Sequence, residues 1–232
     1  MKKILIFGCS FTLGSYKPIS KELVYSNEDW IAPDELIRGS YGWWYFVNYF
    51  KNKEVTIIAL SERGYWAFYQ ILLYLEENKE LNYDEIWIQE TREPRPTIEH
   101  FKKTIEQLNK PGVKLNGFNL KAIDPVGHLS LSRRKISKEF EPFAVWISFF
   151  EEMTKSCARN IDNLCAEKNI KGYVWSMYEP IMENNHFIRL PLQYMKKKLK
   201  EKNLLVPGEH IGMHQTEEGN KYIGKLINEA LN

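Results

Sequence analysis

The sequence predicts an α/β protein, with a central parallel sheet of about five strands and helices on both faces of the sheet. Short, continuous apolar runs such as Ile4–Phe7 are typical of parallel strands, because both faces of such strands are covered. These runs alternate along the chain with longer segments of helical periodicity, and strands joined by helices form parallel sheets through right-handed crossovers. We find no linker, repeat or low-complexity tract, so we expect one domain over residues 1–232.

Each expected element has its own signal. Apolar runs rich in β-branched residues predict the strands, and apolar residues spaced three or four apart predict the helices. Pro142 suits the first turn of a long helix, and Thr216 is a good N-cap for the last one. The expected order is strand Ile4–Phe7, a short buried helix over Tyr41–Phe50, strand Val55–Leu60, helix Tyr65–Leu81, strand Tyr83–Gln89, helix Pro142–Asn169, strand Gly172–Met177, helix Leu190–Lys202 and helix Thr216–Leu231.

Residues 92–140 stand apart from this pattern. They contain four prolines and many charges, and we expect no core element there beyond one helix near 97–109. A stretch of this length between core elements is usually a functional insertion, so we interpret 92–140 as one.

The composition excludes several classes of partner. The net charge is +2, from 32 basic and 30 acidic side chains, so no bulk charge favours nucleic acid or an anionic membrane. The basic run Lys196–Lys202 is interpreted as a solvated helix face. Three cysteines without a C-x-x-C pattern argue against a disulfide framework or a structural zinc site, and Cys157 and Cys165 are expected to be buried free thiols. We expect no metal and no cofactor.

The chain has no apolar stretch of the roughly 18 residues that a membrane helix needs. The apolar run after Lys3 has four residues, which is shorter than the roughly 7–15 residues of a signal-peptide core. Together with the free thiols, this predicts a cytoplasmic protein in a reducing compartment.

Small and polar residues follow the expected strands, at the sheet edge where ligands of such folds bind. Gly8–Gly14 places Ser10 in a glycine-bracketed turn directly after the first strand, where its hydroxyl can be exposed. Gly64 follows the second strand and would let a backbone N–H approach a ligand. The polar cluster Gln89–Glu93 follows the third strand, and His214 lies two residues before the cap of the last helix.

Taken together, these four segments resemble the SGNH, or GDSL-like, hydrolase superfamily. Gly8-Cys9-Ser10-Phe11-Thr12-x-Gly14 is similar to its first block, in a form often seen in bacteriophage members. Gly64 fits the second block, and His214 followed by Gln215–Gly219 resembles the last. The resemblance implies a three-layer flavodoxin-like sandwich and a serine esterase that uses Ser10 as nucleophile and His214 as general base.

The chain departs from the family pattern at two functional positions. The Asn of the third block is missing, and Thr91 or Arg92 would have to stand in for it in the oxyanion hole beside the N–H groups of Ser10 and Gly64. Ile211 replaces the Asp that precedes the catalytic His by three residues. Glu209 is the nearest carboxylate to His214 in sequence, Glu179 and Glu183 are others, and a Ser–His dyad is a further alternative.

Two functional hypotheses follow from this resemblance. The first is an esterase whose substrate is a small molecule or a glycan that carries acyl or acetyl esters, since many relatives act on acetylated sugars. The second is a catalytically impaired module that binds a glycan or serves a structural or assembly role, for example in a phage particle, where it would be virion-associated. The oligomeric state is left open.

Other chemistries have weaker support in the sequence. A nucleotidyl transferase would need a His pair soon after the first strand, but no His occurs before His100. The dinucleotide-binding and P-loop glycine patterns are both absent. A cysteine hydrolase that uses Cys9 is an open alternative, although nothing places a base beside Cys9 rather than Ser10. His210 and His214 would form a metal pair only on a helix, which Gly212 disfavours.

Overall fold

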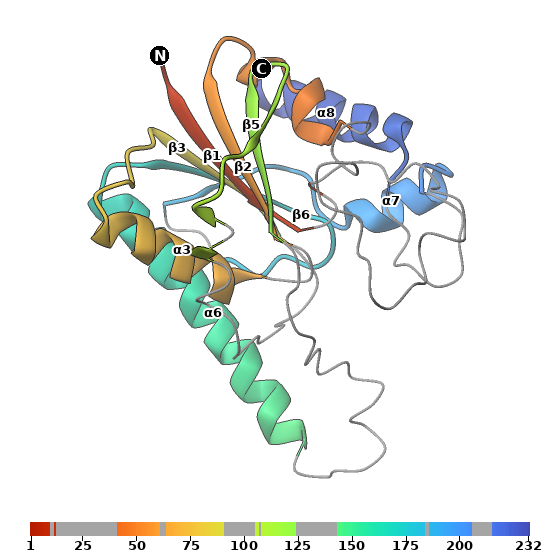
Figure 1. Cartoon of the computed structure of the whole chain (residues 1–232). Helices are drawn as coiled ribbons and strands as arrows, with labels where there is room; N and C mark the ends of the chain where they lie inside the picture. Colours follow the sequence, from red (N-terminus) through yellow and green to blue (C-terminus); the bar gives the residue numbers. More distant parts are fainter. Residues whose placement is uncertain are drawn as a thin grey trace, which may run out of the picture.

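The computed structural model describes residues 1–9, 12, 41–60, 64–90, 105–106, 108–123, 143–183, 186–205 and 215–232. Its centre is a seven-stranded sheet in the order β4-β5-β2-β1-β3-β6-β7 (Figure 1). The strands are β1 (Lys3–Gly8), β2 (Glu54–Leu60), β3 (Glu85–Glu90), β4 (Val113–Leu115), β5 (Phe118–Ile123), β6 (Lys171–Ser176) and β7 (Ile188–Arg189). Six of them pair in parallel, and β4 runs antiparallel to β5 at one edge. The predicted α/β class and flavodoxin-like sandwich are confirmed.

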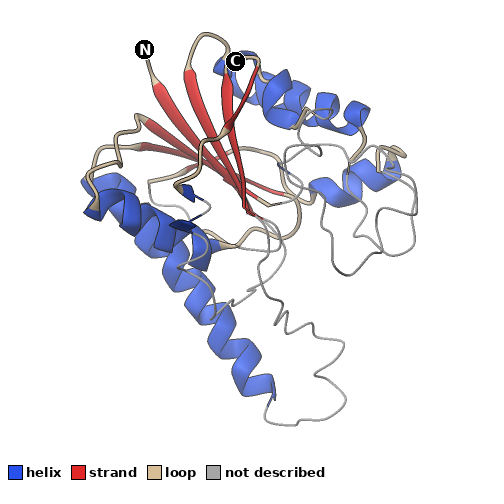
Figure 2. Cartoon of the chain, viewed as in Figure 1, coloured by secondary structure: helices blue, strands red, loops and turns tan. Residues whose placement is uncertain are grey.

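Helices cover both faces of this sheet (Figure 2). Helices α3 (Tyr65–Glu77) and α6 (Phe143–Glu167) pack together on one face. Helices α7 (Met195–Glu201) and α8 (Glu217–Leu231) lie on the other, with the 3-10 turns η1 (Trp43–Phe46) and η2 (Asn48–Phe50). Alternate side chains of β1 divide between the two layers: Leu5 and Phe7 join the α3–α6 core, whereas Ile4 and Ile6 join the other. Because both faces are buried, the strand has a continuous apolar sequence.

Most expected elements are confirmed to within a few residues. Helix α6 spans Phe143–Glu167, and α3 begins at Tyr65 as expected but ends earlier, at Glu77. Thr216 is the N-cap of α8, and its hydroxyl accepts a hydrogen bond from Gly219 N at 3.1 Å.

Two predicted helices are partly wrong. The aromatic run over 41–50 forms two short 3-10 turns instead of one helix. Residues 188–194 are not helical, and only Met195–Glu201 forms helix α7. The reason is pairing with β6 and the segment after it: Leu190 N donates to Val174 O at 2.9 Å, and Tyr194 N donates to Tyr178 O at 3.1 Å. These backbone bonds override the helical preference of the leucine- and lysine-rich sequence.

The expectation that residues 92–140 contain no core element beyond one helix is wrong, because they supply two strands of the sheet. β5 pairs in parallel with β2 from Phe118 opposite Val55 to Ile123 opposite Leu60. The β4–β5 hairpin turns at Asn116 and Gly117, which have φ of 47° and 90°. This dipeptide is the strongest short-range hairpin signal in a sequence, because both residues tolerate positive φ. Of the helix predicted near 97–109, only residues 105–106 and 108 lie within the described, helical part of the chain.

The carboxyl ends of the central strands share one edge of the sheet. β1 is in register with β3 up to Phe7 and Ile88, and β3 is in register with β6 up to Glu90 and Ser176. In sheets of this kind the ligand site lies beyond this edge. None of the helices in the described part of the chain has the length and apolar character needed to cross a membrane.

Candidate functional site

Of the residues predicted to form the site, the structure describes Gly64. The others lie outside the described residues: Ser10, Thr91, Arg92, Glu209 and His214. Their neighbours along the chain are described, however, and these neighbours show how the surrounding elements are held.

A tight turn follows β1, as the sequence predicts. Thr12 N donates to Cys9 O at 2.8 Å, so these two residues lie together directly after β1. Thr12 is fully buried, and its side chain lies so close to Gly8 that a Cβ added there would overlap the Thr12 hydroxyl. Gly8 is therefore required by the close approach of Thr12.

Gln89 connects this turn to the end of β3. Its side chain is fully buried, and Oε1 accepts hydrogen bonds from the Thr12 hydroxyl and, at 3.3 Å, from Trp43 Nε1. Gln89 Nε2 lies 3.9 Å from Cys9 Sγ. The first residue of the predicted polar cluster thus binds the turn after β1.

Gly64 is the N-cap of α3, and neither its backbone nor its packing requires glycine. Its φ of −132° and ψ of −150° belong to extended backbone that other residues also adopt. Apart from Gly64 itself, its chain neighbours and the backbone of the first turn of α3, no described residue has an atom within 4 Å of the position that a Cβ would occupy. The space beside Gly64 is therefore free of described side chains, as an approaching ligand would require.

The residue after His214 is firmly anchored. Gln215 is fully buried and forms an isolated antiparallel bridge with Leu205. Its Nε2 donates to Asn220 Oδ1 at 2.8 Å, and Asn220 Nδ2 donates to Tyr41 O at 3.1 Å. The start of α8 is thereby tied to the segment that precedes η1.

The same segment also contacts the turn after β1. Trp44 Nε1 donates to Thr12 O at 2.8 Å. A Cβ added to Gly42 would overlap both the Thr12 carbonyl and the Trp44 indole, so the chain passes directly over the turn. Residues 41–44 therefore join the chain neighbours of Ser10 to those of His214.

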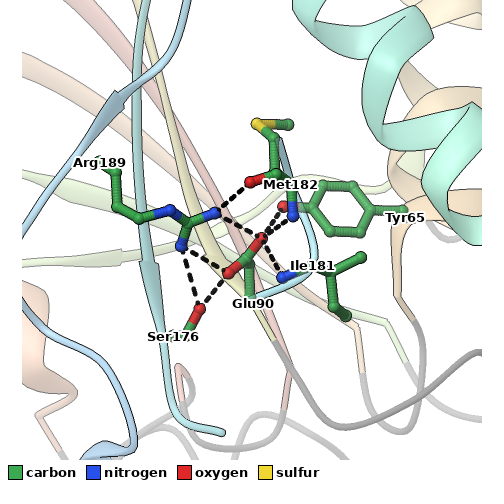
Figure 3. Close-up of polar contacts among 6 residues, drawn as sticks. All are labelled: Tyr65, Glu90, Ser176, Ile181, Met182 and Arg189. Atoms are coloured by element: carbon green, nitrogen blue, oxygen red, sulfur yellow. Dashed lines mark hydrogen bonds and ion pairs between the residues drawn. The ribbon is translucent and has the colours of Figure 1, made fainter. Parts of the chain in front are cut away.

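A buried polar cluster at this edge surrounds Glu90 (Figure 3). The sequence places Glu90 in the polar segment Gln89–Glu93 but does not indicate the partners of its carboxylate. Glu90 is fully buried and forms an ion pair with Arg189, with Oε2 2.9 Å from Nη1. Among the described residues, six hydrogen-bond donors contact its carboxylate: Tyr65 Oη, Ser176 Oγ, the backbone N–H groups of Ile181 and Met182, and both Nη atoms of Arg189.

A carboxylate offers about four lone-pair sites, so the acceptor capacity of Glu90 is already used. It is therefore poorly suited to orient a catalytic imidazole. Burial, together with the charge of Glu90 and its hydrogen bond, raises the pKa of Tyr65 well above its usual range. The Tyr65 hydroxyl consequently remains a proton donor to Glu90.

The two other carboxylates considered as partners of His214 are both exposed. Glu179 and Glu183 lie in the segment after β6. The pKa of Lys155 on α6 is raised, first by its hydrogen bond to Glu152 and more weakly by the charge of Glu183. Glu183 therefore lies near Lys155 of α6. Helix α6 covers one face of the sheet, and Gln215 lies in the layer on the other face.

The expectation of buried free thiols is confirmed for Cys157 and Cys165. Burial, with a smaller contribution from the charge of Asp162, raises the pKa of Cys165 to about 12. Burial also raises the pKa of Cys157. Both groups therefore remain neutral thiols near neutral pH, which suits packing more than nucleophilic chemistry.

No protein-family model, curated protein or solved structure matches this chain.

Proposed function

We propose that this protein is a serine esterase in which Ser10 is the nucleophile and His214 is the general base. The observation that carries the proposal is the hydrogen-bonded path through residues 41–44. It links Thr12, two residues after Ser10, to Gln215, the residue after His214. Ser10 and His214 are 204 positions apart in the chain (214 minus 10), yet the segments next to them share one network at the carboxyl edge of the sheet.

In this proposal the Ser10 hydroxyl attacks the carbonyl carbon of an ester while His214 takes the hydroxyl proton. The carbonyl π bond opens, and the tetrahedral oxyanion accepts hydrogen bonds from the N–H groups of Ser10 and Gly64. When the intermediate collapses, His214 gives the proton to the departing alcohol and an acyl-serine remains. Water then repeats the sequence and releases the acid.

The open space beside Gly64 supports this role, because a ligand oxygen can approach the backbone there without meeting a described side chain. One oxyanion donor is worth roughly 2.7–4 kcal/mol of transition-state stabilisation. The absence of the third-block Asn would therefore slow the reaction without abolishing it. Thr91 and Arg92 are the proposed substitutes, and Glu209 is the proposed acidic partner of His214.

The second candidate is a non-catalytic module of the same fold that binds a glycan or takes part in an assembly. Ile211, in place of the expected Asp, is the observation that favours it. The loss of that carboxylate removes the group that normally orients the imidazole and stabilises its charged form.

One experiment separates these two functions. Wild type and Ser10→Ala are incubated with p-nitrophenyl acetate and, separately, with a fluorophosphonate probe. The esterase proposal requires hydrolysis and covalent labelling by wild type, and the loss of both in the variant. Cys9→Ala serves as the matched control, because it removes the adjacent thiol and leaves Ser10 in place. Equal, near-background signals in wild type and Ser10→Ala would instead support the binding module, whereas loss of activity in Cys9→Ala alone would assign the nucleophile to the thiol.

A further inference from the structure

We propose that Gln89 and Glu90, consecutive residues at the end of β3, are positioning residues that act on opposite faces of the sheet: Glu90 fixes the backbone of Gly64, a proposed oxyanion donor, and Gln89 fixes Thr12, which follows the proposed nucleophile by two residues in the sequence. This inference rests on the proposed esterase function for its kinetic consequence. The structural role of Glu90, which is to hold the start of α3, is tested independently of any activity, and the role of Gln89 is tested through kcat in a variant that remains folded.

Gln89 acts on the segment that follows β1, through Thr12. Its side-chain oxygen accepts from the buried Thr12 hydroxyl, and Thr12 N closes the turn onto Cys9 O. Trp43 Nε1 donates to the same Gln89 oxygen at 3.3 Å, which locks the amide in one orientation. The turn is thus held from the face of the sheet covered by η1 and α8.

Glu90 acts on the donor that follows β2. Tyr65 Oη donates to Glu90 Oε1 at 2.7 Å, and Tyr65 is the first residue of α3, directly after Gly64 (Figure 3). The Tyr65 ring is 2% exposed and packs in the core on the α3–α6 face. The hydrogen bond therefore fixes where α3 begins, and with it the position of the Gly64 backbone.

The alternation of side chains along a strand explains why two neighbouring residues serve the two faces. A carboxylate buried at this depth needs compensation, which Arg189 supplies as an ion pair and Met182 N supplies as a hydrogen-bond donor at 2.7 Å. These partners also hold the segment after β6 against the end of β3. The Glu90 carboxylate is therefore held in one position, and it sets the position of Tyr65. It takes no part in the chemical steps of the proposed reaction.

Tyr65→Phe is the decisive variant, because it removes one hydrogen bond and keeps the aromatic ring and the Glu90–Arg189 pair. Tyr74→Phe is its matched control: it removes a tyrosine hydroxyl from the far part of the same helix, where the partner is the exposed Asn109. For Gln89, the variant is Gln89→Met, which keeps the length of the side chain and removes its amide. Each protein is assayed for kcat and KM with p-nitrophenyl acetate, for thermal unfolding, and for hydrogen–deuterium exchange in peptides covering residues 64–68 and 70–77.

We expect Tyr65→Phe and Gln89→Met each to lower kcat by about ten-fold while KM stays within about two-fold, because displaced donors act on the transition state. Tyr65→Phe also accelerates exchange in residues 64–68 and not in 70–77, and Tyr74→Phe changes neither kcat nor exchange at 64–68.

Unchanged exchange at 64–68 in Tyr65→Phe would overturn the role of Glu90, whether or not wild type is an esterase. Unchanged kcat in a variant that remains folded, or a kcat loss no larger than the loss of folded protein, would overturn the positioning role of that residue. If wild type has no esterase activity, the proposed function fails by itself, and the exchange measurement still decides whether Glu90 positions the start of α3.

Discussion

Among the described residues, no packing contact requires a glycine at position 64. A substitution there therefore separates an effect on activity from an effect on stability. The φ of Gly64 is negative, and the described residues leave open the space where a Cβ would be. Gly64→Ala should therefore change the free energy of unfolding by less than about 1 kcal/mol, because the reduced freedom of the unfolded chain offsets a poorer N-cap. The added methyl group would occupy the space beside the proposed oxyanion donor, so kcat/KM for p-nitrophenyl acetate should fall at least about ten-fold.

Gly117 provides the matched control for this prediction. The space around it is equally open among the described residues, but its φ is +90°, which L side chains rarely adopt. Gly117→Ala should lower the free energy of unfolding by about 1 kcal/mol or more and leave the activity unchanged. Urea denaturation and the ester assay measure both quantities. A large stability loss in Gly64→Ala would show that the glycine is structural.

The residues of the candidate site differ in how far the sequence can specify them. The sequence indicates Ser10, Gly64 and His214 because small or polar residues follow expected strands or precede an expected helix. The Glu90–Arg189 pair could not be found in this way, since the two residues are 99 positions apart and neither stands in a motif. A polar residue at a strand end indicates the edge of the sheet, but its partner depends on which segment the tertiary fold brings there.

At the level of elements, α8 depends on a cap that lies close to the proposed base. The Thr216 hydroxyl accepts from Gly219 N at 3.1 Å, and Thr216 N donates to Leu204 O at 2.9 Å. Thr216→Ala removes the first bond and also the bond that the Thr216 hydroxyl donates to Leu204 O at 3.2 Å, and it keeps the backbone bond, so it should lower the free energy of unfolding by about 1 kcal/mol or more.

Thr216→Ser is the control, because it restores the acceptor and should recover most of this stability. Chemical denaturation of the three proteins gives the comparison. Equal stabilities of wild type and Thr216→Ala would mean that α8 is held by its packing against η1 and not by its cap.

Elements were predicted well where local signals agree with tertiary pairing. Helix α8 has an N-cap residue and an apolar stripe, and both were visible in the sequence. Strand β5 was missed because the charges around 92–140 suggested an insertion, although the Asn116-Gly117 dipeptide pointed to a hairpin. Strand β7 has two residues, and it exists because Ile188 lies opposite Tyr173 in the sheet. No local pattern specifies so short a strand.

At the level of the whole molecule, the alternation of strands and helices was enough to predict a parallel sheet. The predicted number, about five strands, is too low, because the sheet has seven: the edge strand β4 and its neighbour β5 were not expected, nor was the short strand β7. The shared edge that carries Gly8, Glu90 and Ser176 follows directly from parallel pairing. The hydrogen bond between Asn220 and Tyr41, which are 179 positions apart, arises from the tertiary fold and has no local signal in the sequence.

The opposite, amino-terminal edge of the sheet has its own buried carboxylate, which predicts a pH dependence of stability separate from any site chemistry. Glu85 is fully buried and accepts from Tyr49 Oη at 2.6 Å, Lys2 Nζ at 2.9 Å and Trp87 Nε1 at 3.3 Å. Burial by itself raises the pKa of Glu85. The hydrogen bonds from Tyr49, Lys2 and Trp87 together outweigh burial, and the net pKa is lowered.

A carboxyl group whose pKa is lower in the folded state stabilises that state above its unfolded pKa of about 4.3, and this contribution disappears as the pH falls through the folded value. Wild type should therefore lose more free energy of unfolding between pH 6 and pH 3 than Glu85→Gln, which has no carboxyl group at this position to protonate. Glu229→Gln is the control, since Glu229 is exposed on α8 and pairs with Lys225 only at 3.7 Å. Urea denaturation across this pH range gives the slopes. Parallel slopes for wild type and Glu85→Gln would show that the Lys2–Tyr49–Trp87 cluster does not favour the ionised carboxylate, and that the acid sensitivity of the fold arises elsewhere.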